Sequence, residues 1–381
     1  MNVLHVIPYA SAIYGGPVFV VKQMAEALAE RGVSIDVVTT TAHGAEELDV
    51  PIGAPLLRGA ARYFYFPRQG PRFWMYSRPL RNWLYQHVTD YDLVHVHGLF
   101  AYPTLPACAA ARHFGIPYII TPHGVLDPWS MSQKWWKKWP YFYFLERRNL
   151  ACANVIHVTA SLEASGVARL GFGQKTKIIP LSIDLPVYHE REAREGRALS
   201  LLFLSRLHPK KGLPVLFEAL ALLRGHFNVM ARLRVVGDGP DEYVAELTDL
   251  AKRLGVLEHI EFVGFLQGEA KAQALAEADV FVLPSYQENF SLAAAEALAV
   301  GTPVVVSDQV GIAEEIKLAG AGLVVPAHAP KDLANAIAKF SNPAFRRTAG
   351  KNARALAENR FSPAQFGTAL LDLYRDTLES K

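Results

Sequence analysis

The chain has 381 residues and a formal net charge of +3, and 51% of its residues are hydrophobic. This length exceeds one ordinary hydrophobic core, so two domains are expected. No apolar run approaches the ~20 residues that cross a bilayer, and the first residues carry no basic leader or cleavage site, which predicts a protein that is neither secreted nor integral to a membrane.

The cysteines and the charge distribution indicate the setting. Cys108 and Cys152 lie in alanine-rich surroundings, which predicts buried free thiols in a reducing compartment and hence a cytoplasmic protein. Positive charge is concentrated in the first half, most densely over residues 58–148, whereas the second half is slightly acidic. The basic first half indicates an anionic partner there.

Strands and helices alternate through the first half. Short β-branched apolar runs recur between helix-length amphipathic segments, which is typical of parallel α/β layers. The predicted strands cover residues 3–7, 34–39, 93–96, 118–121, 155–158 and 177–179, and the predicted helices cover residues 18–30, 141–151 and 162–170.

The second half repeats this alternation after a break. Residues 185–198 are rich in Pro, Gly and charge and are predicted to be a linker. The later predicted strands cover residues 201–204, 233–236, 260–263, 280–283, 304–306 and 323–325, and predicted helices over 342–358 and 363–378 close the chain. We therefore predict two doubly wound, Rossmann-like parallel-sheet domains, residues 1–184 and 199–362, whose strands end at a shared cleft.

A glycine pair follows the first predicted strand. Gly15 and Gly16 precede Pro17, which suits the first position of a helix. Paired glycines let the backbone approach a ligand, although the same pair also occurs in ordinary tight turns.

Basic residues follow the first strand of the second half. Arg206 lies at the end of that strand and Lys211 at the start of the next helix, so their charges are expected to converge on a volume suited to phosphate. The alternative is a solvated basic loop. Gly237 and Phe265 follow the next two strands, where a nucleotide base could lie against the phenylalanine ring.

Two glutamates lie in the segment over residues 285–301. Glu288 is expected in a loop after the strand over 280–283, and Glu296 inside the helix that follows. A strand-to-helix turn directs unpaired N–H groups and the positive end of the helix dipole at one point, which suits an anion. Carboxylates beside such a point indicate sugar hydroxyls next to a phosphate. The alternative is a solvated loop and an exposed helix face.

Several short motifs occur together in a characteristic order. They are Gly15-Gly16, His97-Gly98, Pro122-His123-Gly124, Arg206 with Lys211-Gly212, Gly237-Asp238-Gly239, Glu288 to Glu296, and Gly301-Thr302-Pro303-Val304-Val305. This set resembles glycosyltransferase family 4, and the resemblance covers nearly the whole chain. It implies the GT-B fold, a retaining nucleotide-sugar transferase activity, and a last helix, residues 363–381, that crosses back to an acceptor-binding first domain.

The resemblance also implies roles for individual residues. The implied catalytic set is His123, Glu288, Arg206 and Lys211, with Arg206 and Lys211 on the donor diphosphate and Glu288 on the transferred sugar. The implied donor-binding set is Gly15, Gly16, Arg206, Lys211, Gly237, Phe265, Glu288, Asn289, Phe290, Ser291, Leu292 and Glu296, with Glu296 on the ribose. The family's usual loop is Glu-Gly-Phe-Gly, whereas this chain has Glu288-Asn289-Phe290-Ser291. Asn tolerates positive φ and Ser is a good N-cap, so the loop is expected to form.

A metal site is not expected. Asp90 and Asp92 have the Asp-x-Asp spacing that holds a divalent ion in another class of glycosyltransferases, but they lie at the amino end of a predicted strand. His95 is predicted to be a core residue and His97 to face the cleft. We therefore expect no metal or other cofactor.

Two clusters of aromatic and basic residues mark the acceptor side. They cover residues 62–76 and 133–142, and such mixtures favour a bilayer interface, sugar stacking or, for some rings, core packing. The candidates for acceptor or membrane contact are His97, Trp129, Lys134, Trp135, Trp136, Lys137 and Lys138. Peripheral contact with the inner face of a membrane is expected, and a nucleic-acid role is not, because no binding module accompanies the basic residues.

The sequence thus predicts transfer of a hexose-type sugar, with UDP as the expected nucleotide, to a saccharide or lipid-linked saccharide in polysaccharide biosynthesis. Retention is expected without a covalent intermediate, with the leaving diphosphate stabilised by basic residues and helix amides. Two alternatives are a sugar-nucleotide epimerase on the same architecture and a non-catalytic sugar-binding protein of two α/β domains.

Overall fold

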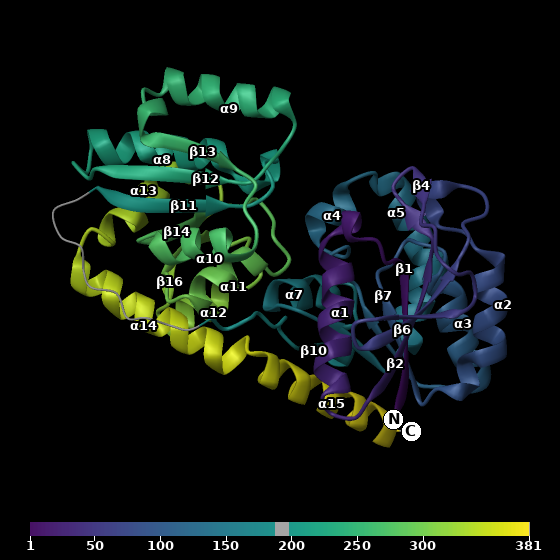
Figure 1. Ribbon diagram of the computed structural model, residues 1–381. Coiled ribbons are helices and arrows are strands. Elements are labelled where there is room, and N and C mark those ends of the chain that lie inside the picture. Colours follow the sequence, from purple (N-terminus) through teal and green to yellow (C-terminus); the bar gives the residue numbers. More distant parts are fainter. Residues whose placement is uncertain (187–197, 381) are drawn as a thin grey trace. The chain divides into compact units, whose positions relative to one another are not determined.

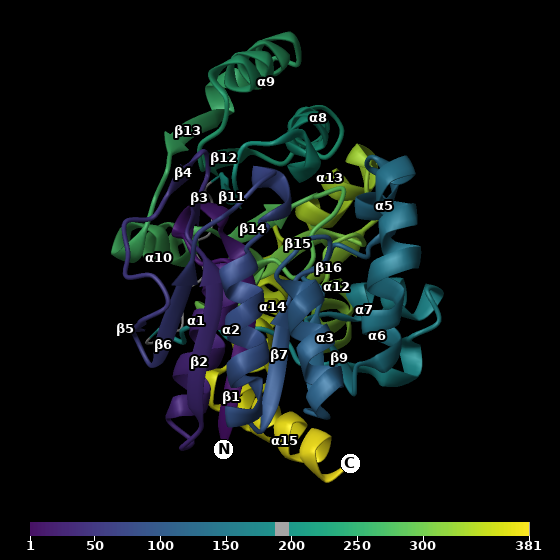
Figure 2. The same ribbon diagram turned by 90° about the vertical axis from the view of Figure 1, so that its right-hand side faces the viewer.

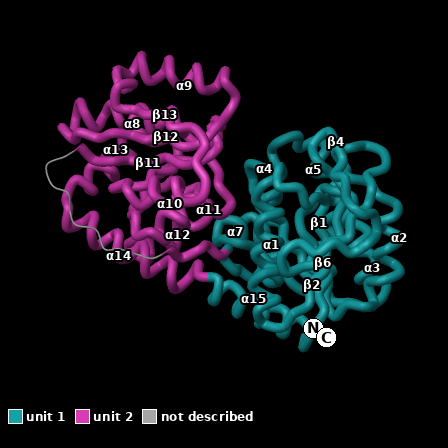
Figure 3. Tube along the Cα trace, in the orientation of Figure 1, with its two compact units in different colours: residues 1–181, 363–381 teal, residues 182–362 magenta. Residues whose placement is uncertain are grey.

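The computed structural model describes residues 1–186 and 198–380, and the chain folds into two compact units (Figure 3). Unit 1 comprises residues 1–181 together with the segment from Pro363 onward, and unit 2 comprises residues 182–362. Most of the predicted linker, residues 185–198, lies outside the described residues. No helix within the described ranges has the length and apolar character needed to cross a membrane.

Unit 1 is built on an eight-stranded sheet in the order β10-β9-β8-β7-β1-β2-β6-β5. All neighbouring strands are parallel except β5, which pairs antiparallel to β6 at the edge. The strands are β1 (Asn2–Tyr9), β2 (Ser34–Thr40), β5 (Pro55–Arg58), β6 (Ala61–Phe66), β7 (Leu93–His97), β8 (Tyr118–Thr121), β9 (Val155–Val158) and β10 (Thr176–Ile178), and a separate hairpin joins β3 (Ala42–His43) to β4 (Glu46–Glu47).

Helices cover both faces of this sheet, with α1 on one side and α2 and α3 on the other (Figure 1). The α-helices of unit 1 are α1 (Gly16–Ala29), α2 (Arg78–His87), α3 (Thr104–Phe114), α4 (Pro128–Ser132), α5 (Trp135–Tyr141), α6 (Arg147–Cys152), α7 (Ser161–Arg169) and α15 (Pro363–Glu379). Short 3-10 turns are η1 (Ala12–Tyr14), η2 (Arg72–Trp74), η3 (Val88–Asp90) and η5 (Gly173–Lys175), and η4 (Phe142–Glu146) is a π-helical turn.

The last helix, α15, packs against the first, α1 (yellow and purple in Figures 1 and 2). Arg31, just after α1, donates to the carbonyl oxygen of Ala364 at 2.8 Å and lies 3.5 Å from the Thr368 hydroxyl. Helices α1 and α15, which lie near opposite ends of the sequence, therefore pack together within unit 1.

Three sequence predictions in unit 1 are corrected. The aromatic run over residues 62–66, for which no strand is predicted, belongs to strand β6. Its Tyr63, Tyr65 and Phe66 are buried, so these rings follow the core-packing alternative, as an inner strand requires. The helix predicted over 141–151 begins earlier, at Trp135, and is divided by the π-helical turn. Cys108 is buried as predicted, but Cys152, the last residue of α6, is exposed.

Unit 2 contains a fully parallel six-stranded sheet in the order β13-β12-β11-β14-β15-β16. The strands are β11 (Leu199–Leu204), β12 (Ala231–Val236), β13 (Ile260–Gly264), β14 (Val280–Leu283), β15 (Val304–Ser307) and β16 (Gly322–Val325). The helices are α8 (Leu213–Gly225), α9 (Asp241–Arg253), α10 (Gly268–Glu277), α11 (Leu292–Ala299), α12 (Ala313–Ala319), α13 (Pro330–Lys339) and α14 (Pro343–Arg360), with 3-10 turns η6 (Pro209–Lys211) and η7 (Leu257–His259).

The central strands of unit 2 are buried along their whole length. Every residue of β14 and β15 is buried, as expected for parallel strands covered by helices on both faces. Their continuous Val-rich sequences made them easy to locate from the sequence alone.

Each sheet reverses its strand order at one point. In unit 1 the chain leaves β1 toward β2 and returns at β7 on the other side of β1, and in unit 2 it leaves β11 toward β12 and later returns at β14. Ligands of doubly wound sheets bind outside the carboxyl ends of the strands at this reversal. The loops after β1, β7, β11 and β14 are therefore where a site is expected.

Candidate functional site

In unit 2, the carboxyl ends of β11, β12 and β13 are tied together by backbone hydrogen bonds. The N–H of Ser205 donates to Val236 (3.1 Å), that of Leu207 to Asp238 (2.8 Å), and that of Gly237 to Gly264 (2.8 Å). Arg206, Gly237 and Phe265 consequently lie along one edge of the sheet, as the sequence predicted. Phe265 is 65% exposed, so its ring face is open.

Gly237 cannot be replaced without moving the backbone at this edge. Its φ is +134°, and a Cβ atom there would lie 1.9 Å from the carbonyl oxygen of Ser205. A contact that close is impossible for real atoms, so the loop around Arg206 depends on this glycine.

Two basic residues follow β11. Arg206 is exposed and forms no ion pair within residues 1–186 and 198–380. Lys211 ends the short turn η6, and its Nζ forms an ion pair with Oε2 of Glu288, which lies beyond the adjacent strand β14. The Lys211 and Glu288 side chains are 14% and 22% exposed, so the pair is largely shielded. Among the described residues, Arg206 is therefore an unpaired cation at the strand reversal and Lys211 a paired one.

The backbone of Glu288 is fixed on both sides. Its N–H donates to the carbonyl oxygen of Gln309, and its own carbonyl accepts from the N–H of Gly311, each at 2.9 Å. This short bridge holds the Glu288 loop against the segment after β15. The carboxylate is thus carried by a residue whose backbone N–H and carbonyl are both hydrogen-bonded to the segment after β15.

The loop leads into helix α11 through an unusual residue. Ser291 adopts φ +78° and ψ 78°, and its hydroxyl accepts from the N–H of Ala294 at 3.3 Å. Phe290 is buried against Phe361, with ring centroids 5.5 Å apart. The sequence predicted that Asn289 would tolerate a positive φ, but the left-handed residue is Ser291, at the position where the family pattern has its second glycine.

The N-terminus of α11 offers unpaired donors. Within the described parts of the chain, the backbone N–H groups of Leu292 and Ala293 have no hydrogen-bond acceptor. These groups and the helix dipole favour an anion at this end. They lie in the same loop-helix segment as Glu288 and its partner Lys211.

Glu296 lies in α11 and pairs with a residue that the sequence analysis missed. Its Oε1 is 2.7 Å from Nζ of Lys271 on α10, and both side chains are about one-third exposed or less. No short-range pattern marks Lys271, because the two residues come together only through packing of α10 against α11.

In unit 1, the predicted glycine pair begins helix α1. Gly15 has φ +72° and is the N-cap, and Gly16 is the first helical residue. A Cβ atom at either position would meet no heavy atom within 4 Å. Open space therefore surrounds this backbone at the strand reversal of unit 1.

His97 corrects a prediction. Its side chain is completely buried, and it hydrogen bonds to His5 (2.9 Å) and His123 (3.1 Å). It is unavailable for direct contact with an acceptor, because its position on β7 directs it to the face that α15 covers, beside His95. The role of His95 as a core residue is confirmed by its full burial.

His123 is only half-buried and adopts φ +59°. The N–H of the next residue, Gly124, donates at 2.5 Å to the buried carboxylate of Glu163 on α7, which also accepts from the Thr159 N–H at 2.9 Å. Burial raises the pKa of Glu163 to about 7, although these hydrogen bonds oppose the shift. Glu163 thus anchors the His123 loop, a role that no local motif indicated.

Three buried histidines approach the geometry of a metal site. The ligand nitrogens of His5, His95 and His97 lie within 4.8 Å of one another, and imidazole suits several transition metals. Each of their ring nitrogens, however, is already hydrogen-bonded to a neighbouring side chain. The cluster is fully satisfied as it stands, so we assign no metal to it.

The Asp-x-Asp pair has separate partners. Oδ2 of Asp90 lies 3.2 Å from Nδ1 of His87, and Oδ2 of Asp92 accepts a hydrogen bond from the backbone N–H of Asn2 at 2.7 Å. The two carboxylates are therefore engaged apart rather than around one point.

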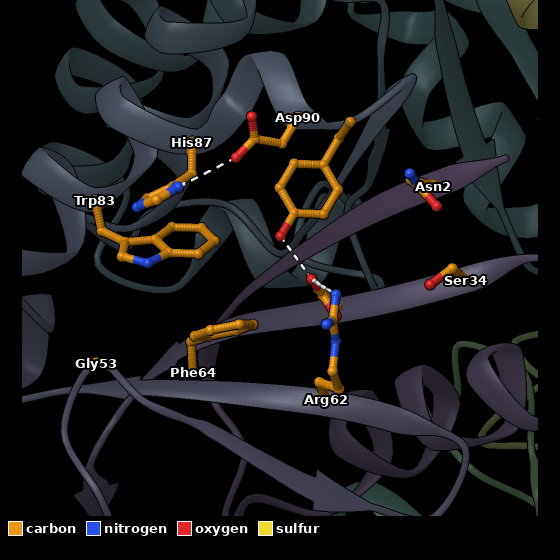
Figure 4. A pocket seen from close by; sticks show the side chains of 10 residues that line it. Asn2, Ser34, Gly53, Arg62, Phe64, Trp83, His87 and Asp90 are labelled. Atoms are coloured by element: carbon orange, nitrogen blue, oxygen red, sulfur yellow. Dashed lines mark hydrogen bonds and ion pairs between the residues drawn. The ribbon is translucent and has the colours of Figure 1, made fainter.

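A cavity of about 430 Å³ in unit 1 lies near these aspartates, at the amino ends of the strands (Figure 4). One lining residue, Asp36, accepts two hydrogen bonds from Arg62 (2.7 and 2.8 Å) and one from the Tyr91 hydroxyl (2.6 Å). None of the predicted site residues lines it.

The second aromatic-basic cluster is largely exposed. Trp135 and Trp136 on α5 are 62% and 60% exposed, and Lys137 lies 4.7 Å above the Trp136 ring. Lys138 differs, because its ammonium group donates to the Ser130 carbonyl at 2.5 Å and burial lowers its pKa. The exposed members at or near α4 and α5 are Trp129, Lys134, Trp135, Trp136, Lys137 and Trp139.

Comparisons with known proteins match both halves of the chain. Residues 15–182 match the family described as a glycosyl transferase 4-like domain, and residues 186–356 match the glycosyl transferases group 1. A D-inositol 3-phosphate glycosyltransferase of Saccharomonospora viridis is 29% identical, with 96% of this chain and 90% of the relative covered. An uncharacterized glycosyltransferase of Methanocaldococcus jannaschii is 26% identical, with 97% of each covered.

Solved structures share the fold. Sucrose-phosphate synthase from Thermosynechococcus elongatus superposes with a TM-score of 0.74 at 22% identity, over 100% of both chains. Anabaena HepE in complex with UDP gives a TM-score of 0.73 at 20% identity, over 99% of this chain and 100% of that one. These neighbours and the two parallel-sheet units establish the GT-B fold.

Proposed function

The chain belongs to glycosyltransferase family 4 and is a glycosyltransferase, and from this premise we propose that it transfers a hexose-type sugar from a UDP-sugar to a hydroxyl of a saccharide or lipid-linked saccharide, with retention at the anomeric carbon. Unit 2 is the proposed donor domain and unit 1 the proposed acceptor domain. Polysaccharide biosynthesis at the inner face of a membrane is the proposed setting.

The observation that carries this proposal is the charge arrangement at the strand reversal of unit 2. Arg206 is unpaired within the described ranges, Lys211 is held beside Glu288, and the first N–H groups of α11 point out of the helix. A diphosphate between these groups would gain charge-assisted hydrogen bonds, which are the stronger class in proteins. The same donors would stabilise the charge that develops on the leaving diphosphate.

The sugar and ribose roles are assigned to the two glutamates. Glu288 is proposed to accept hydroxyls of the transferred sugar, because its backbone is fixed next to the cations. Glu296 is proposed to bind the ribose, and Phe265 and Gly237 the base. On unit 1, His123 and Gly16 are proposed to contact the donor, on the strength of the family resemblance.

The nucleotide is proposed from structural relatives and is the part most easily tested. HepE is recorded with UDP and with UDP-glucose, which supports uracil here. A thermal-shift screen of UDP, GDP, ADP and their sugars is the direct experiment, since a ligand at 100 times its Kd adds about 2.7 kcal/mol to stability. Stabilisation by UDP compounds alone is expected, and a response to none of the nucleotides would refute the proposal.

Substitution of Glu296 tests the ribose role. Glu296→Ala should weaken UDP binding while leaving the fold intact, whereas Glu277→Ala, which removes an exposed glutamate from α10, should leave UDP affinity unchanged. Equal UDP affinity in wild type and Glu296→Ala would exclude this role.

The acceptor is best approached by a direct comparison. Several curated relatives are named D-inositol 3-phosphate glycosyltransferases, so inositol 3-phosphate is one acceptor to test against lipid-linked saccharides. Product formed only with donor and acceptor together supports transfer. Conversion of the donor without any acceptor would instead identify an epimerase.

Membrane contact is proposed through Trp135 and Trp136, whose exposed rings stand among lysines. Sedimentation with anionic phosphatidylglycerol vesicles should capture the wild type and lose most of a Trp135→Ala/Trp136→Ala variant. Phe227→Ala removes an exposed ring from unit 2 and serves as the control. Equal sedimentation of all three proteins would refute this contact.

A further inference from the structure

A row of buried polar side chains crosses one face of the unit 1 sheet. On β1 and β7 the histidines alternate with apolar residues that pack toward the other face, and in-register pairing places His5 beside His95 and His97 beside Thr121. Tyr374 of α15 covers the row. The fully or almost fully buried members are His5, His95, His97, Thr121, His157 and Tyr374.

These side chains and His123 form one continuous series of hydrogen bonds, which we call the histidine chain. Its contacts run from His123 Nε2 to His97 Nδ1 (3.1 Å), His97 Nε2 to His5 Nδ1 (2.9 Å), His5 Nε2 to Tyr374 OH (3.2 Å), Tyr374 OH to His95 Nδ1 (2.7 Å), His95 Nε2 to Thr121 Oγ1 (2.7 Å), Thr121 Oγ1 to His157 Nδ1 (3.0 Å), and His157 Nε2 to the carbonyl oxygen of Ile179 (3.1 Å).

The histidines of the chain are neutral at pH 7. Burial lowers the pKa of His5 to about 3 and that of His157 to about 4, and it lowers the pKa of His95 and His97 well below the ordinary value. Loss of hydration likewise lowers the pKa of His123 to about 3. A neutral imidazole has one N–H donor and one acceptor nitrogen, so each ring can pass a hydrogen bond in only one direction.

The end of the chain sets that direction. The Ile179 carbonyl only accepts, so His157 must carry its proton on Nε2, and its Nδ1 must accept from the Thr121 hydroxyl. Thr121 then accepts from His95 Nε2, and Nδ1 of His95 accepts from the hydroxyl of Tyr374, whose pKa burial raises, keeping it protonated.

The same logic continues to the exposed end. The Tyr374 oxygen accepts from Nε2 of His5, and each remaining ring repeats the pattern, with Nε2 donating and Nδ1 accepting. His123 is the last member, and its Nδ1 has no hydrogen-bond partner among the residues that the structure describes.

We propose that the histidine chain fixes the tautomer of His123, so that its Nδ1 is a permanent acceptor for a hydroxyl of a bound sugar. The identity of the ligand rests on the proposed function. The tautomer itself does not. Tyr374 and Thr121 are positioning residues in this scheme, because each hydroxyl accepts on one side and donates on the other and thereby transmits the direction set at Ile179.

This arrangement predicts selectivity for the chemical class of the ligand. A hydroxyl can donate to Nδ1, whereas an ionised carboxylate only accepts and would set lone pair against lone pair. A ligand that leaves a polar group of the site, here Nδ1 of His123, without a hydrogen bond is rejected more strongly than one that differs only in its apolar contacts. A sugar bearing a hydroxyl at this point is thus favoured over its uronic acid counterpart.

The test is nitrogen NMR of the full chain with 15N-labelled histidine, because the protonated and unprotonated nitrogens of a neutral ring have well-separated shifts. The wild type at pH 7 should show all five rings as pure Nε2–H tautomers, with the His123 signals identified by their loss in His123→Asn. Nδ1–H on His123, a protonated His123 ring, or averaged shifts in the wild type would overturn the tautomer assignment.

Two variants test transmission along the chain. Tyr374→Phe and Thr121→Val each remove a hydroxyl that lies several hydrogen bonds from His123 along the histidine chain. In both variants His123 should begin to populate the Nδ1–H form. Thr121→Ser retains a hydroxyl and should preserve the wild-type pattern. Thermal unfolding confirms that each variant is folded, and an unchanged His123 tautomer in both hydroxyl-free variants would refute transmission, as would a change in Thr121→Ser.

Addition of UDP-glucose to the labelled wild type separates this inference from the proposed function. A shift of the His123 Nδ1 resonance on binding supports the contact. Binding detected by calorimetry without any shift at Nδ1 would refute the contact and leave the proposed function standing. No binding of any UDP compound would refute the proposed function and the ligand assignment, with the tautomer still decided by the free protein.

Discussion

Replacement of Ser291 by glycine should stabilise unit 2, although it removes a helix cap. Ser291 adopts φ +78°, and the left-handed region costs a residue with a side chain roughly 1–2 kcal/mol relative to glycine. Two effects reduce this gain. Exchange of a serine cap for glycine costs only a few tenths of a kcal/mol, and the greater conformational freedom of glycine in the unfolded chain costs about 0.5–1 kcal/mol. The net gain expected is about 0.5 kcal/mol.

Thermal unfolding of Ser291→Gly and Ser291→Ala separates the two contributions. A gain of that size raises Tm by roughly 1–2 °C for a unit of this length. Ser291→Ala keeps the strained backbone and loses the hydroxyl that accepts from Ala294, so it should lose about 1 kcal/mol. Ser291→Gly therefore should exceed Ser291→Ala by several degrees, and equal or reversed Tm values would refute the assignment of strain to Ser291.

Two further predictions concern stability. Gly237→Ala should lower the free energy of unfolding by more than about 4 kcal/mol, a loss seen only for severe lesions, because its Cβ would lie 1.9 Å from the Ser205 carbonyl oxygen. Urea unfolding measures this loss. In the control, Gly225→Ala, the added Cβ meets no heavy atom within 4 Å, so this variant should unfold near the wild-type urea midpoint. Acid should destabilise unit 1. Burial lowers the pKa of His157 from its ordinary 6.5 to about 4 in the folded state. Between pH 6.5 and 4 the unfolded state therefore binds a proton that the folded state does not, and the free energy of unfolding falls as the pH falls through that range. His157→Gln should flatten the pH dependence measured by urea unfolding, and an equal slope would contradict the buried neutral state.

Much of the fold follows from local patterns, and the residues that failed show why the rest does not. Strand β14 is a continuous apolar run because both of its faces are buried, and a sequence displays that directly. For the aromatic run of strand β6 the sequence leaves core packing and an interface open, because Tyr and Phe suit both. Only the pairing of β6 with β2 decides between them.

The site shows the same division. Lys211 and Glu288 are 77 positions apart, yet their meeting was predictable because the carboxyl ends of parallel strands share an edge. Lys271, Glu163 and Tyr374 were missed because each meets its partner through the packing of a helix. No spacing in the sequence encodes the closeness of Tyr374 to His5, which lies at the other end of the chain.

The most direct test of the central claim, that the strand reversal of unit 2 binds a nucleotide diphosphate, is calorimetric titration of UDP into wild type and Lys211→Ala. A charge-assisted hydrogen bond contributes on the order of 1.5–3 kcal/mol, which corresponds to a roughly 10- to 150-fold increase in Kd. Lys252→Ala removes an exposed lysine from α9 and should retain wild-type affinity. An unchanged Kd in a folded Lys211→Ala would contradict the account.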